Sequence, residues 1–68
     1  MHSLDSIDKW EYRSEVFELR GPYDGPPGSA IIRMNELGAE GWELVSTSVR
    51  AQEYSGTMLC MFKRRRVE

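Results

Sequence analysis

The sequence contains a single cysteine, Cys60, and a single histidine, His2. One cysteine cannot close an intramolecular disulfide, and one histidine at the N-terminus cannot complete a metal cage with it. No histidine is placed to activate a serine or a thiol, so the usual nucleophile and base pairs are missing. The apolar sequence neighbours of Cys60 favour a buried structural thiol. The sequence therefore predicts no catalytic residues, no metal, no cofactor and no enzymatic activity.

Long apolar runs and a charge excess are also missing. No segment approaches the roughly 20 apolar residues of a membrane span. Nine Lys and Arg residues against eleven Asp and Glu residues give a formal net charge of -2. A net charge of this sign and size does not attract the protein as a whole to nucleic acid or to an anionic membrane. The first eight residues carry acids and no apolar core, unlike a signal peptide. We therefore expect a cytoplasmic protein without membrane contact.

The chain of 68 residues is long enough for one small domain. We expect a flexible N-terminal tail over residues 1–8 and a single domain over residues 9–66. In a domain of this size, apolar burial only about balances the conformational entropy that folding removes. Disulfides and metals are excluded as additional sources of stability. Oligomerisation is then the remaining way to bury more apolar area.

The apolar periodicity predicts one helix and three strands. Strands are expected at residues 9–19, 42–50 and 57–65, with a turn at 51–56. Residues 21–28 hold three prolines and three glycines and predict a loop. A short helix follows this loop, with Ser29 as its N-cap. Arg33 and Glu36, three residues apart, are expected on the solvent side of this helix. No repeat and no second domain is indicated.

The strands carry apolar residues on both faces. In the first strand, the apolar parity changes between Val16 and Phe17, which either a bulge or burial of both faces would explain. In the second strand, Leu44 shares one face with Trp42, and Val45 and Val49 fall on the other. In the third strand, apolar residues occupy both parities: Met58, Cys60 and Phe62 on one, Leu59 and Met61 on the other.

The segment 35–45 predicts the junction between the helix and the second strand. Gly41 suits the left-handed conformation that ends a helix. Gly38 makes the helix less stable than alanine would at this position, and it suggests that the helix approaches the sheet closely. Trp42 would then anchor the start of the strand. An anion site is disfavoured here, because the C-terminal end of a helix is electrically negative.

Three motifs carry a family resemblance: Trp10-Glu11-Tyr12-Arg13, the block from Leu37 to Ser46, and Phe62-Lys63-Arg64. In these motifs, over about residues 9 to 65, the chain resembles a small bacterial and phage family, the domain of unknown function 4177. It departs from the family in the loop at 21–28, at Ser14 and in its N-terminal tail. The resemblance implies the same fold and brings no activity, cofactor or catalytic residue. The residues to which we assign structural roles are Trp10, Tyr12, Leu37, Gly38, Gly41, Trp42, Leu44 and Phe62.

Two features are candidates for binding. The basic run Lys63-Arg64-Arg65-Arg66 could contact phosphates, although a solvated strand end that protects a sheet edge is the favoured interpretation. The aromatic set could form a stacking platform for bases, although core positions are favoured. This set comprises Trp10, Tyr12, Phe17, Trp42 and Phe62.

The sequence thus predicts an α+β fold of strand, helix, strand and strand. The single helix packs on one face of a three-stranded antiparallel sheet, whose strand order stays open. Because one helix covers one face only, we expect the other face or a strand edge to be buried in a homodimer. The leading functional hypothesis is a non-enzymatic interaction module with a protein or small-ligand partner. The alternative is a nucleic-acid binder that uses the basic run and a tyrosine, Tyr54 or Tyr23.

Overall fold

The computed structural model describes residues 9–20 and 25–66. The expected tail at 1–8 lies outside the described residues, as do residues 21–24 of the expected loop. The elements are β1 (Trp10–Arg20), α1 (Gly28–Ala39), β2 (Glu43–Ala51) and β3 (Ser55–Arg65). The predicted α+β fold and its element order are confirmed, and the strand boundaries differ from the expected ones by only one or two residues.

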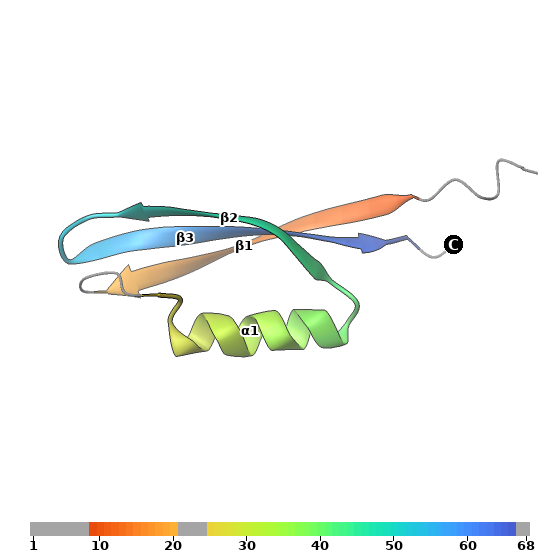
Figure 1. Cartoon of the computed structure of the whole chain (residues 1–68), viewed down its shortest axis with the longest axis horizontal. Helices are drawn as coiled ribbons and strands as arrows, with labels where there is room; N and C mark the ends of the chain where they lie inside the picture. The colour runs from red at the N-terminus through yellow and green to blue at the C-terminus, as the bar shows by residue number, and fades with distance from the viewer. Residues whose placement is uncertain (1–8, 21–24, 67–68) are drawn as a thin grey trace, which may run out of the picture.

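The three strands form one sheet in the order β1-β3-β2. The central strand, β3, pairs antiparallel with both neighbours, so β1 and β2 run parallel to each other along the two edges. Helix α1 connects these edge strands and lies on one side of the sheet (Figure 1). The two sides are called the helix face and the open face from here on.

The core lies between α1 and the helix face. Residues directly opposite in an antiparallel pair point to the same face, and Phe17 stands opposite Met58 in the β1–β3 register. The buried residues come from the first and third strands and from the helix: Leu19, Ala30, Leu37, Met58, Cys60 and Phe62. The predicted shared face of Met58, Cys60 and Phe62 is confirmed, and so is the burial of the Cys60 thiol.

Strand β1 is regular along its whole length. Its register with β3 runs without a shift from Trp10 opposite Arg65 to Arg20 opposite Ser55. The hypothesis of a bulge near Val16 is therefore wrong. Phe17 points to the helix face and packs against the core, whereas Val16 lies exposed on the open face. The parity change in the sequence reflects apolar residues on both faces of a regular strand.

The irregularity occurs in β2 instead. The register shifts between Leu44 and Ser46, so that Val45 has no direct partner in β3. Leu44 pairs with Phe62 and Val49 with Met58, which places both on the helix face. The prediction that Leu44 and Val49 lie on opposite faces is wrong, because the extra residue restores the parity between them.

The helix begins one residue earlier than its expected cap. Pro27 holds the N-cap position in an extended conformation, and no side chain caps the helix. Its carbonyl oxygen accepts hydrogen bonds from the amides of Ala30 and Ile31 at 2.9 and 3.2 Å. The assignment of Ser29 as N-cap is therefore wrong; Ser29 lies within the first turn.

The end of the helix follows the prediction at Gly41 and departs from it at Gly38. Gly41 has φ of 94°. Its amide donates to the Gly38 carbonyl at 3.0 Å, and the Trp42 amide donates to the Leu37 carbonyl at 2.9 Å. This pair of bonds is the Schellman motif. Gly38, however, is exposed, and a side chain added there would meet no atom within 4 Å. The expected close approach at Gly38 is wrong.

Candidate interaction surfaces

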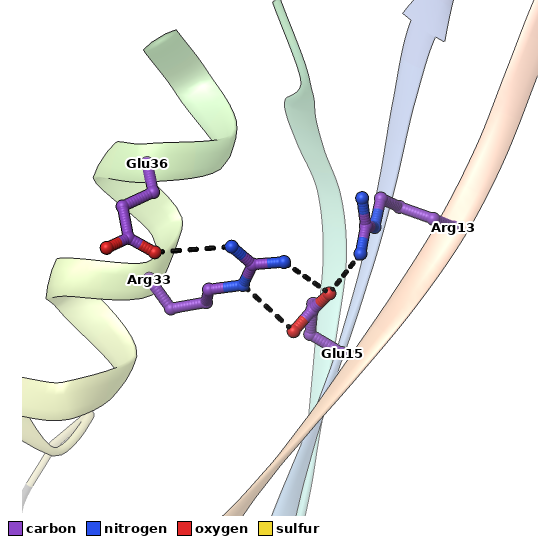
Figure 2. A network of polar contacts seen from close by, with 4 residues as sticks. All are labelled: Arg13, Glu15, Arg33 and Glu36. Carbon is purple, nitrogen blue, oxygen red and sulfur yellow. Dashed lines mark hydrogen bonds and ion pairs between the residues drawn. The ribbon is translucent and has the colours of Figure 1, made fainter. Parts of the chain in front are cut away.

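A charged network joins α1 to β1 beside the core. Arg33 of the helix donates two hydrogen bonds, of 3.3 and 3.4 Å, to the carboxylate of Glu15 in β1. Arg13 donates to the same carboxylate at 2.7 Å. Arg33 also pairs with Glu36, one helical turn further on, at 3.2 Å. Figure 2 shows Arg33 reaching from the helix across to the sheet. Of the charges in this network, Glu15 is the most enclosed.

This network holds Glu15 in its ionised form. Hydrogen bonding from Arg33, reinforced by Arg13, lowers the pKa of Glu15 below its ordinary value, against the opposing effect of burial. Glu15 faces Cys60 in the β1–β3 register. Burial, and then the charge of Glu15, raise the pKa of the Cys60 thiol. A carboxylate that stays ionised is a poor proton donor, and a thiol that stays protonated is a poor nucleophile.

A second cluster surrounds Trp42 at the end of the helix. The guanidinium groups of Arg13 and Arg64 lie over its indole, at 5.3 and 4.3 Å from the ring centre. Arg64 also donates to the Glu11 carboxylate at 2.7 Å and to the Glu40 carbonyl at 3.1 Å. Cation–π contacts and charge-assisted hydrogen bonds thus tie together the start of β1, the helix end and the end of β3.

An open hollow of about 370 Å³ adjoins this cluster. It is lined by Glu11, Glu40, Gly41, Arg64 and Arg65. Two of the lining side chains, Arg64 and Glu11, already form an ion pair with each other. The negative helix terminus and the two acidic residues offset the basic ones, so the hollow has no marked preference for an anion.

The basic run is divided between the two faces of the sheet. Lys63 stands opposite Tyr12 and Arg65 opposite Trp10 on the open face, whereas Arg64 stands opposite Glu11 on the helix face. The Lys63 amine lies 4.4 Å from the centre of the Trp10 ring. Arg66 follows the strand, and its amide donates to the carbonyl of Lys9. The four residues adjacent in sequence do not form one continuous patch.

The aromatic set is divided as well. Phe62 is buried, and Phe17 and Trp42 are partly buried against the core. Trp10 and Tyr12 are exposed on the open face, so the expectation of core positions is wrong for these two. Among the other residues given structural roles, Leu37 is buried and Leu44 is exposed.

The open face carries an apolar patch over β1 and β3. The register sets Val16 beside Leu59 and Ser14 beside Met61, with Tyr12 in the next row. The patch is defined as Tyr12, Val16, Leu59 and Met61. Tyr12 and Val16 expose 61% and 62% of their surface. No described helix covers this face (Figure 1), and serines of β2 border the patch.

A second apolar surface follows the edge strand β2. All nine of its residues are exposed, including Leu44, Val45 and Val49. Leu44 and Val49 point to the helix face, so the helix leaves this side of the face uncovered. Ile31 of the helix is exposed as well. The β2 surface is defined as Ile31, Leu44, Val45 and Val49.

No group of three or more His, Cys, Asp or Glu side chains within residues 9–20 and 25–66 is arranged to hold a metal ion. Helix α1, the one helix in the described part of the chain, is too short to cross a bilayer.

Comparison with known proteins found no matching family model, no matching curated protein and no matching solved structure. The resemblance to the domain of unknown function 4177 family therefore stays a prediction.

Sequence reasoning did not find the contact between Arg33 and Glu15. It placed Arg33 and Glu36 together on the solvent side of the helix. The two side chains form an ion pair, but Arg33 also reaches Glu15 of the sheet. The available signal was a charged residue, Glu15, on the same parity as Phe17 and Leu19. A carboxylate on the strand face that points to the core requires a hydrogen-bonding or charged partner.

Proposed function

We propose that this protein works without catalysis, as a homo-oligomeric interaction module whose copies cover one another's apolar side chains. One observation carries the proposal. In the described chain, ten large apolar side chains are exposed, whereas the buried core has six residues. Seven of the ten belong to two neighbouring groups, the patch on the open face and the β2 surface. Contiguous apolar surface of this kind is typical of interaction sites.

The absence of catalysis in this proposal is supported by the chemistry beside the core. Glu15 is held ionised by Arg33 and Arg13, and Cys60 is held protonated by burial. Neither group is tuned toward the neutral range in which acid–base catalysis works best. The proposal also includes a cytoplasmic location, where reducing conditions suit an unpaired thiol such as Cys60.

Sedimentation velocity of the purified protein at tens of micromolar tests the proposal. The chain has a mass of 7.9 kDa, and we expect the main species to have twice this mass, because a two-fold dimer is the simplest closed assembly. A single species at the monomer mass over this concentration range would contradict the proposal.

A specific observation also favours the alternative, a nucleic-acid binder. Trp10 and Tyr12 share the open face with Lys63 and Arg65, which sets exposed aromatic rings among basic groups. Single-stranded nucleic acids bind to surfaces of this composition. Glu43, opposite Lys63 in the β2–β3 register, reduces the positive charge there.

Electrophoretic mobility shifts with mixed single-stranded oligonucleotides test this alternative. Binding at this end of the open face would appear at low salt, weaken at moderate salt and decrease in Lys63→Glu, because phosphate contacts release counterions. Glu18→Gln, at the other end of the same face, is the matched control. No shift at low salt would rule the alternative out.

A further inference from the structure

The two edge strands of the sheet differ in how they are protected against pairing with a strand of another molecule. Exposed edge strands are usually blocked by charged side chains or prolines. Strand β1 carries five charged residues among its eleven: Glu11, Arg13, Glu15, Glu18 and Arg20. Strand β2 has charges only near its ends, at Glu43 and Arg50. The six residues between them, 44–49, contain no charge and no proline, so the extra residue at Val45 is the one protective feature of this stretch of the β2 edge.

The side chains of the β2 edge on the helix face are mostly apolar, Thr47 being the exception. Leu44 and Val49 point to this face and are exposed there. Ile31 extends the same surface from the helix. It precedes Arg33 by two residues, which is about 200° around a helix, and Arg33 reaches toward β1. Ile31 therefore lies on the flank of α1 that faces away from Arg33, on the β2 side.

The charges of β2 complement each other under two-fold symmetry. Glu43 and Arg50 both lie on the open face, opposite Lys63 and Thr57 of β3. If two copies of β2 run antiparallel with Thr47 at the centre, and Val45 stays unpaired as it does beside β3, Leu44 meets Val49 of the other copy and Glu43 meets Arg50. Opposite charges at such cross-strand positions stabilise pairing.

From these observations we propose that the homo-oligomer is a two-fold dimer in which β2 pairs with β2 of a second copy, forming a continuous six-stranded sheet. The inference rests on the proposed function and specifies its contact surface. An axis perpendicular to the sheet keeps both helices on one face and turns their Ile31 flanks toward each other. The unpaired backbone groups of β2 find partners, and its exposed valines and leucine become covered.

Matched valine substitutions distinguish the edge from the open face. Val49→Lys places a charge on the β2 surface, and Val16→Lys places the same charge on the open face; both valines are exposed in the single chain. We expect Val49→Lys to raise the dimer dissociation constant on the order of a hundredfold, because the dimer would bury two lysines. Val16→Lys should leave the constant unchanged. Sedimentation measures both, and circular dichroism confirms that each variant folds.

A charge exchange tests the arrangement independently, should Val49→Lys fail to fold. Glu43→Arg and Arg50→Glu should each weaken the dimer, and the double variant should restore it. Failure of this restoration would overturn the β2 pairing. A dimer that Val16→Lys dissociates and Val49→Lys preserves would also overturn it, while leaving the proposed function intact. A wild-type monomer would overturn the proposed function itself.

Discussion

At the scale of single residues, Glu15 shows how a polar group is accommodated beside a small core. Its position on the same face as Phe17 and Leu19 would be costly without a partner. Arg33 provides this partner from the helix, and Arg13 provides another from the same strand. The ion pair between Arg33 and Glu15 joins two residues that are 18 positions apart in the sequence.

The lowered pKa of Glu15 predicts a specific acid sensitivity. The unfolded chain binds a proton near the ordinary value of 4.5, and the folded protein does so only at lower pH. The stability that Glu15 contributes is therefore complete above that value and is lost as the pH falls through the lowered pKa. We expect urea unfolding to show a smaller loss of stability below about pH 5 in Glu15→Gln than in the wild type.

Glu18→Gln is the matched control for this experiment, because Glu18 lies on the open face of the same strand, outside the network. A wild-type protein and a Glu15→Gln variant with parallel pH dependence would show that the ion pair with Arg33 does not act on folding.

At the scale of the elements, the end of α1 depends on one backbone conformation. Gly41 and Gly38 are both surrounded by open space, so neither substitution to alanine creates a collision. They differ in their backbone, since only Gly41 has a positive φ. This pair separates the effect of conformation from the effect of packing.

We expect Gly41→Ala and Gly38→Ala to change stability in opposite directions. Alanine at position 41 should cost about 1 to 2 kcal/mol, because an L-residue is strained in the left-handed region. Alanine at position 38 should add about 0.5 to 1 kcal/mol, because glycine is a poor residue within a helix. Chemical denaturation measures both, and equal effects of the two substitutions would contradict the Schellman end.

At the scale of the whole molecule, the small core implies that stability depends on concentration. Helix α1 covers one face over β1 and β3, and the β2 surface stays exposed in the single chain. If assembly covers this surface, the folded state is favoured by mass action. We expect the melting temperature to rise with protein concentration in the wild type and to rise less in Val49→Lys. A melting temperature independent of concentration would argue against assembly in this range.

The residues of the candidate surfaces were predictable in part. Periodicity assigned Met58, Cys60 and Phe62 to one face of β3, because alternation is a property of any strand. It failed in β2, where one extra residue at Val45 changes the parity. It also failed for Trp10 and Tyr12, because nothing in the local sequence states which face of the strand the helix covers.

The sequence by itself determined the order of the elements, the alternation of the regular strands and the helix end at Gly41. These features depend on neighbours along the chain and on the conformations that single residues permit. Only the tertiary structure decided the order β1-β3-β2, the bulge in β2, the ion pair from Arg33 to Glu15 and the exposure of β2. These depend on which elements pack against one another in space: the buried residues of the sheet come from β1 and β3, and those of β2 stay exposed.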